Sequence, residues 1–354
     1  MCPILYRRAR KNGDMKLGHG SNTSELRPEE RRLKEAVTHA MRTLGLTADS
    51  VHALEPMARS RTGQNPPYLM KTRSGTFVLK LERAARTRCH AWRRDLTGLS
   101  AFKRELAVYE ALDKLRFVSL CFPRLVATDQ KTYMLLDFVN TMHQPSLSSW
   151  FSTALLNALL EFQTIPHHLK GSTLGPQPMT MALSPVGTFL RRSLINMRRT
   201  MGIGTALQCI RALRNWSQAQ PKQPKPIWLH NDFHPNNVLV DNRGKLYLTD
   251  FEQTTEERRW VLVDIVHYAT DAYSFTIDVD LIRCYVDRLE ASAVFAGPLD
   301  YSTQLRFALL LRSMHHLFTV ASPSSVKERY RHFVTAVLLS DQAYSNWYEW
   351  NRVF

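Results

Sequence analysis

The sequence predicts an α+β protein of two lobes, a small β-rich N-terminal lobe and a larger, mostly helical C-terminal lobe. Between residues 51 and 136, strand-like apolar runs alternate with a single helical pattern. From Trp150 onward, apolar residues recur mainly with helical spacing. A length of 354 residues is sufficient for two lobes, and 44% hydrophobic with 22% charged residues is ordinary for a globular protein.

The N-terminal region predicts a tail followed by a helix. Residues 1–27 are basic and polar without periodicity, so we expect them to be disordered. A helix is expected within residues 28–50, because Pro28 suits a first helical turn and Gly45 suits a helix end. The apolar stripe between them has helical spacing and consists of Leu33, Val37, Ala40, Met41 and Leu44.

The first lobe is expected to span residues 51–137. Thr76–Leu81 predicts a strand in which Lys80 and the preceding leucine lie on opposite faces. Ala101–Leu112 has apolar residues at a helical period, and Glu105 lies on this helix.

Two further strands are predicted at the end of this lobe. Residues 121–127 and 133–139 are apolar runs, and Asp137 and Val139 lie at the end of the second. The C-terminal lobe is then expected over residues 138–354. Its helical patterns occupy residues 150–162, 190–216 (one helix or two), 258–274, 279–293, 302–320 and 326–348.

The most informative block, residues 228–252, predicts a hairpin. The runs 238–240 and 245–248 predict two strands, joined by the turn-forming residues Asp241–Gly244. Because each residue of both strands advances about 3.3 Å, the hairpin returns Asn237 and Asp250 to the same end.

The residues at that end predict a metal-assisted phosphoryl-transfer site. Asn237 and Asp250 offer carbonyl and carboxylate oxygens, the hard ligands that Mg²⁺ prefers. Asp232, five residues before Asn237, is placed to accept a hydroxyl proton. A surface hairpin with solvated turn acids is the alternative interpretation.

This block resembles the catalytic signature of protein kinases, in the variant of the aminoglycoside phosphotransferase and choline kinase superfamily. The pattern His-x-Asp-x-x-x-x-Asn corresponds to His230, Asp232 and Asn237, and the metal-binding Asp-Phe-Gly corresponds to Asp250-Phe251-Glu252. The resemblance covers roughly residues 50–340. It implies a protein-kinase-like fold with the active cleft between the lobes, Asp232 as the catalytic base, and Asn237 and Asp250 as metal ligands.

The resemblance also implies roles for residues outside the block. Lys80 would contact the α- and β-phosphates of the nucleotide, and Glu105 would pair with Lys80. The backbone groups of Asp137 and Val139 would bind adenine. The phosphate-covering turn should fall at residues 60–65, which contain a single glycine, so a plain polar turn is an equal alternative.

Two residues are expected to support the site structurally. Asp264 is flanked by apolar residues and is similar to the family's third aspartate, which supports the catalytic loop. A buried aspartate needs hydrogen-bond partners. His230 is expected to organise the loop rather than act as a base or ligand.

The implied function is that of an ATP- and Mg²⁺-dependent phosphotransferase. It would move the γ-phosphoryl group to a hydroxyl of a small molecule or glycan, of the choline or ethanolamine, amino sugar or aminoglycoside, or lipopolysaccharide sugar type. A catalytically idle kinase-like binding module is one alternative, against which the intact Lys80, Asp232, Asn237 and Asp250 argue. A basic nucleic-acid-binding protein is another, and no helix-turn-helix, zinc-finger or RNA-recognition signature supports it.

Charge and cysteine usage bear on partners and location. The net charge is +16, and residues 150–229 hold nine Lys and Arg against one acid, Glu161. This balance favours an anionic acceptor and leaves open a peripheral contact with an acidic membrane surface. Five scattered cysteines without a Cys-x-x-Cys pair, together with no signal-like or bilayer-spanning apolar run, predict a cytoplasmic protein.

Overall fold

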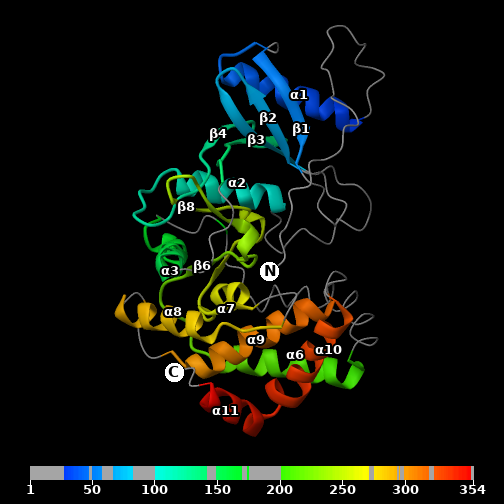
Figure 1. Ribbon diagram of the computed structural model, residues 1–354, viewed down its shortest axis with the longest axis vertical. Helices are drawn as coiled ribbons and strands as arrows, with labels where there is room; N and C mark the ends of the chain where they lie inside the picture. Colours follow the sequence, from blue (N-terminus) through cyan, green and yellow to red (C-terminus); the bar gives the residue numbers. More distant parts are fainter. Residues whose placement is uncertain are drawn as a thin grey trace. The chain divides into compact units, whose positions relative to one another are not determined.

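The computed structural model describes most of the chain in eleven stretches (Figure 1). They are residues 28–47, 50–57, 67–82, 100–141, 149–169, 174, 201–270, 275–292, 295, 299–318 and 323–351. The predicted tail over residues 1–27, the phosphate-covering turn at residues 60–65 and the helical pattern over residues 190–200 lie outside the described residues.

The chain forms two compact units, the first of residues 1–91 and 123–140 and the second of residues 92–122 and 141–354. The described residues 100–122 belong to the second unit, whereas the sequence placed them in the first lobe. The reason lies in the Ala101–Leu112 helix, α2: the Tyr109 ring meets Phe251 edge-on at 5.2 Å, and Arg104 donates to the Glu252 carbonyl at 3.0 Å.

The first unit is a five-stranded antiparallel sheet with one helix packed against it. The strands follow the order β1-β2-β3-β5-β4. The elements are α1 (Pro28–Thr43), β1 (Val51–Pro56), β2 (Tyr68–Thr72), β3 (Gly75–Leu81), β4 (Leu125–Thr128) and β5 (Tyr133–Asp137). The helix ends at Thr43, next to the glycine that the sequence predicted as its end: Gly45 takes a φ of 67°, and the N–H of Leu46 returns to the Met41 carbonyl at 2.9 Å.

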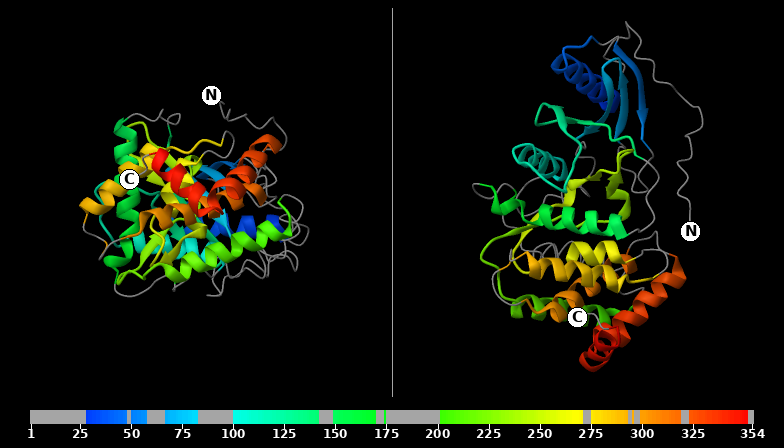
Figure 2. Two further views of the ribbon diagram at one scale, coloured as in Figure 1. Left: turned by 90° about the horizontal axis from the view of Figure 1, so that it is seen from below. Right: turned by 60° about the vertical axis from the view of Figure 1, so that its left-hand side comes forward.

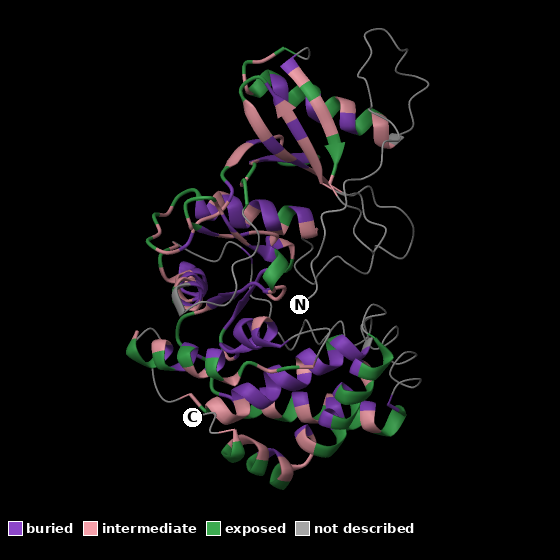
Figure 3. Cartoon of the chain, in the orientation of Figure 1, coloured by how far each residue is buried: buried purple, intermediate pink, exposed green. Residues whose placement is uncertain are grey.

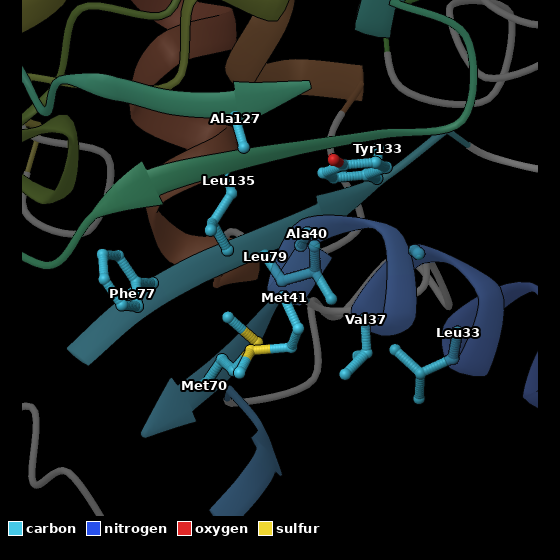
Figure 4. Packing of buried hydrophobic residues seen from close by; sticks show 11 residues of the cluster. Leu33, Val37, Ala40, Met41, Met70, Phe77, Leu79, Ala127, Tyr133 and Leu135 are labelled. Carbon is cyan, nitrogen blue, oxygen red and sulfur yellow. The ribbon is translucent and has the colours of Figure 1, made fainter. Parts of the chain in front are cut away.

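The core of this unit lies between α1 and one face of the sheet (Figure 4). Alternation along β3 places Phe77 and Leu79 in this core, while Lys80 is half-buried on the other face. The predicted apolar stripe of α1 supplies the opposing surface, with Ala40 and Met41 almost fully buried. The strand and helix periodicities of the sequence are therefore confirmed here.

The second unit is mostly helical, with two short ladders of strands. Its helices are α2, α3 (Ser149–Gln163), α6 (Ile203–Ala219), α7 (Val263–Ala269), α8 (Val279–Ala291), α9 (Tyr301–Phe318), α10 (Ser324–Phe333) and α11 (Asp341–Trp350). Short helical turns are η3 (Ile165–His167), η4 (Pro235–Asn237), η5 (Phe251–Gln253) and the π-turn η6 (Val334–Leu338). The strands are β6 (Ile227–Leu229), β7 (Val238–Val240), β8 (Leu246–Leu248) and β9 (Thr255–Glu257), paired β6 with β9 and β7 with β8.

The helix α9 forms the centre of the helical layer (Figures 1 and 2). It contacts α6, α7 and α10, and most of its surface is buried (Figure 3). Within this layer Trp260 stacks on Phe307 with ring centroids 3.6 Å apart. None of the helices in the described part of the chain is both long and apolar enough to cross a membrane.

One predicted helix is broken. The pattern over residues 326–348 predicted a continuous helix, but the structure has α10, η6 and α11 there. Ser340 causes the restart, because its extended backbone leaves the helix and its hydroxyl accepts the N–H of Ala343 at 3.2 Å. With its antiparallel sheet and helical C-terminal region, the chain has the predicted α+β architecture.

Candidate active site

The candidate site is built on the loop that follows β6, and a buried carboxylate holds this loop. Asp264, in the first turn of α7, has no exposed surface. Its two oxygens accept the backbone N–H groups of His230 and Asn231, each at 2.8 Å. Burial raises the pKa of the Asp264 carboxyl despite the opposing effects of His230 and these N–H donors.

The loop turns sharply at Asn231, which adopts a left-handed backbone with a φ of 60°. Its side-chain amide donates to the Gln253 carbonyl at 2.9 Å and to the Thr255 hydroxyl at 2.8 Å. A left-handed non-glycine residue costs conformational energy, so its surroundings must hold it in place. These bonds tie the loop to the segment that follows Asp250.

Asp232 and Asn237 lie in contact at the end of the loop. The Asn237 amide nitrogen donates to the Asp232 carbonyl at 2.9 Å and lies 3.3 Å from the Asp232 carboxylate. The nitrogen is thus used within the loop, and the amide oxygen accepts no hydrogen bond from another described residue.

The predicted hairpin brings Asp250 to the same place. β7 and β8 pair with Val238 opposite Leu248, and the N–H of Thr249 donates to the Asn237 carbonyl at 3.0 Å. This bond places Thr249, the residue before Asp250, directly against Asn237. Asp250 is itself left-handed, with φ 66° and ψ 58°.

Aromatic packing fixes this end of the hairpin. Phe251 is fully buried and stacks on Phe162 with centroids 5.5 Å apart. The His230 ring lies 5.3 Å from Phe251, and its Nε2 donates to the Thr249 carbonyl at 2.9 Å. His230 thus joins the loop to the hairpin, in the organising position expected from the sequence.

The electrostatics around Asp232 keep it ionised. Burial, and to a smaller extent Asp250, raise the pKa of this carboxyl, but the facing imidazole of His234, helped by His230, outweighs them, and the net shift is downward. Nε2 of His234 lies 3.7 Å from an Asp232 oxygen. Nδ1 of His234 accepts the N–H of Asn236 at 3.2 Å, so in the neutral imidazole it is Nε2–H that faces Asp232.

The other predicted site residues lie on regular elements. Lys80 is on β3 opposite Met134, and Glu105 is buried on α2. Asp137 ends β5 with its carboxylate 3.1 Å from Nε of Arg124, and Val139 follows it, half-buried. Because Lys80 and Glu105 belong to different units, their pairing stays a prediction.

The structure adds a group of residues that sequence analysis did not select. We call it the histidine row and define it as His234, His267, His315 and His316, with Arg312 beside it. His234 falls within the signature block, which could have drawn attention to it. The other members lie on α7 and α9, and no sequence spacing connects them to the block.

We expect Asp264→Ala to destabilise the protein and inactivate it together. The substitution leaves two backbone N–H donors without an acceptor, and each such donor costs about 1–3 kcal/mol. Chemical denaturation should therefore show an unfolding free energy lower by about 2 kcal/mol or more. An unchanged unfolding free energy in that experiment would show that Asp264 does not stabilise the loop.

Comparison with known protein families identifies a phosphotransferase. Residues 58–293 match the phosphotransferase enzyme family (APH). No curated protein matches the chain in sequence.

Solved structures of similar fold include several small-molecule kinases. Choline kinase LicA from Streptococcus pneumoniae has a TM-score of 0.55 at 13% identity, over 87% of this chain and 98% of that one. The microcompartment-associated aminopropanol kinase has a TM-score of 0.56 at 14% identity, over 90% and 99%. A thermostable mutant of aminoglycoside phosphotransferase APH(4)-Ia, solved with ADP and hygromycin B, has a TM-score of 0.53 at 13% identity, over 86% and 98%.

Proposed function

This chain belongs to the phosphotransferase enzyme family, and we propose that it transfers the γ-phosphoryl group of ATP to a hydroxyl of a small-molecule acceptor. One observation carries the proposal. Asp232, Asn237 and Asp250 converge at one end of the hairpin through hydrogen bonds that the chain itself provides. Phosphoryl transfer depends mainly on positioning and charge stabilisation, which such a fixed group supplies.

Asp232 is proposed as the residue that meets the acceptor. Its lowered pKa keeps it a carboxylate in the neutral range, and its side chain is 22% exposed, so a hydroxyl can reach it. It would orient the acceptor hydroxyl and accept its proton as the bond to phosphorus forms. Asn237 fixes the carboxylate through the bonds described above.

Asn237 and Asp250 are proposed to hold Mg²⁺. The amide oxygen of Asn237 is left for a ligand, and Asp250 contributes a carboxylate, so both offer the hard oxygen donors that this ion prefers. When bound, Mg²⁺ would neutralise charge on the phosphate oxygens. Two protein ligands fit an ion that usually keeps waters and substrate phosphates in its remaining positions.

The nucleotide is proposed to contact the first unit. Lys80, half-buried on β3, would hold the α- and β-phosphates, with Glu105 as its partner. Backbone groups of Asp137 and Val139 would bind adenine. The ADP bound to the aminoglycoside phosphotransferase of similar fold supports the choice of an adenine nucleotide.

An acceptor screen tests this function. ADP release should be measured with sugars, aminoglycosides, choline, ethanolamine and aminopropanol, using Asp232→Ala as the control. We expect at least one hydroxyl compound to raise ADP release in the wild type and not in the variant. ADP release that no acceptor stimulates, with ATP still bound, would favour the catalytically idle binding module.

A further inference from the structure

Two buried glutamines, which we call the glutamine clamp, hold the segment that leads into α7. The N–H of Val261 donates to Oε1 of Gln304 at 3.0 Å, and the Val261 carbonyl accepts Nε2 of Gln163 at 3.1 Å. Nε2 of Gln304 also donates to the Arg259 carbonyl. Gln163 lies on α3 and Gln304 on α9, and they are 0% and 1% exposed. Val261 is therefore fixed at both its backbone donor and its backbone acceptor by side chains from two separate helices.

A tyrosine from a third helix orients one of these glutamines. The hydroxyl of Tyr285, on α8, donates to Oε1 of Gln163 at 2.6 Å. Burial raises the pKa of this phenol well above its ordinary value, so the hydroxyl keeps its proton and acts as the donor. The carbonyl of Val261 can only accept, so the amide nitrogen of Gln163 must face it. Both ends of the Gln163 amide are thus assigned by their partners.

The glutamine clamp is joined to the carboxylate that holds the candidate active-site loop. Val261 precedes Asp264 by three residues. Burial raises the pKa of the Asp264 carboxyl, and a hydrogen bond from the Gln163 side chain acts against this rise. Asp264 in turn accepts the two backbone N–H groups at the start of the loop. A connected set of buried hydrogen bonds therefore runs from Tyr285 to the loop that carries Asp232.

The polarity of this network suits it to fixing an orientation. Polar side chains in a protein interior are destabilising unless their hydrogen bonds are made, and apolar residues would fill the same space without that requirement. Hydrogen bonds are directional, whereas apolar contacts are not. Asp264 needs a fixed orientation, because its two oxygens meet two adjacent N–H groups at 2.8 Å each.

We propose that the glutamine clamp and Tyr285 are positioning residues for phosphoryl transfer. They fix Asp264, which in turn fixes the loop that presents Asp232 to the acceptor. This inference rests on the proposed function and adds to it three residues that do not touch the reacting atoms. A looser network lowers the fraction of molecules in which the loop is correctly formed, and turnover falls with that fraction.

Tyr285→Phe tests the network with the smallest change, because it removes one hydroxyl and keeps the ring. We expect kcat to fall by about three- to tenfold, the effect of one hydrogen bond, with an acceptor that stimulates ADP release. KM for ATP should stay at the wild-type value, because the N–H of Thr249 holds Asn237 separately at 3.0 Å. An unchanged kcat would overturn the proposal.

Tyr344→Phe is the matched control. Tyr344 is 3% exposed, and its hydroxyl donates to the Ser302 carbonyl at 2.8 Å, so the same chemical change removes a buried hydrogen bond outside the network. This variant should lose stability as Tyr285→Phe does and keep the wild-type kcat. An equal loss of kcat in both variants would overturn the proposal, because a general loss of stability would then explain it.

Gln163→Met tests the path through the glutamine. Methionine is close to glutamine in volume but makes none of its hydrogen bonds, so kcat should fall further than in Tyr285→Phe. Adding Tyr285→Phe to this variant should lower kcat no further, because the hydroxyl acts through the glutamine. Additive losses would contradict that path. If Gln163→Met does not fold, Tyr285→Phe and its control decide.

Hydrogen exchange separates a failure of this inference from a failure of the proposed function. The N–H groups of His230 and Asn231 report whether Asp264 still holds them, with or without turnover. Their exchange should be about three- to tenfold faster in Tyr285→Phe and unchanged in Tyr344→Phe. If the wild type phosphorylates no acceptor, the proposed function fails and exchange alone decides the inference. Unchanged exchange in Tyr285→Phe, or faster exchange without loss of kcat in an active enzyme, would overturn it.

Discussion

Asp232→Asn should lower kcat by roughly 10²- to 10⁴-fold, the usual contribution of a positioned general base. Asparagine has the same shape and keeps an oxygen for the Asn237 amide, so the loop should be preserved. Only the ability to accept a proton is removed. Nucleotide affinity should therefore stay at the wild-type value when it is measured by titration of ATP with Mg²⁺.

Asp241→Asn is the matched control for this loss. Asp241 lies in the turn of the same hairpin, where its carboxylate accepts the N–H groups of Arg243 and Lys245 at 2.8 and 2.9 Å. Asparagine makes the same kind of turn, so kcat should not change. Near-normal turnover by Asp232→Asn would show that Asp232 is not the general base, whatever the control shows.

Asp250→Asn should weaken the binding of Mg²⁺ and ATP by about 10- to 100-fold, a range typical of changes around a metal site. Asparagine tolerates the left-handed backbone that Asp250 adopts, so the hairpin end should keep its conformation. The lower affinity for Mg²⁺ and ATP would then come from the missing carboxylate charge.

The comparison with and without Mg²⁺ is the internal control for this variant. ATP affinity measured in EDTA should be the same for the wild type and Asp250→Asn. A variant in which Mg²⁺ still raises ATP affinity as strongly as in the wild type would show that Asp250 is not a metal ligand.

Local chemistry made the centre of the site predictable from the sequence. The run Val238–Val240, the turn residues Asp241–Gly244 and the return strand fix the hairpin register within a few residues. That register alone sets Thr249 against Asn237 and brings Asp250 to the same end. The alternation along β3 likewise placed Lys80 away from the core.

Contacts between distant segments could not be predicted in this way. The grouping of α2 with the second unit depends on Tyr109 meeting Phe251, which lie far apart in the chain. The break before α11 depends on one cap at Ser340, which the apolar pattern of residues 326–348 obscured. Side-chain capping and ring packing override periodicity at such points.

The histidine row shows the same limit for the acceptor. Composition indicated positive charge over residues 150–229, whereas the basic group near Asp232 comes from α7 and α9, later in the chain. Only the fold shows which side chains lie beside the proposed base.

Phosphorus NMR of the reaction product tests the central proposal most directly. The wild type should be incubated with ATP, Mg²⁺ and an acceptor that stimulates ADP release, and the transferred phosphorus identified. We predict a phosphate monoester on an acceptor hydroxyl, formed in equal amount to ADP and formed far more slowly with Asp232→Asn. Release of the γ-phosphorus as inorganic phosphate alone, with no phosphorylated acceptor, would contradict it.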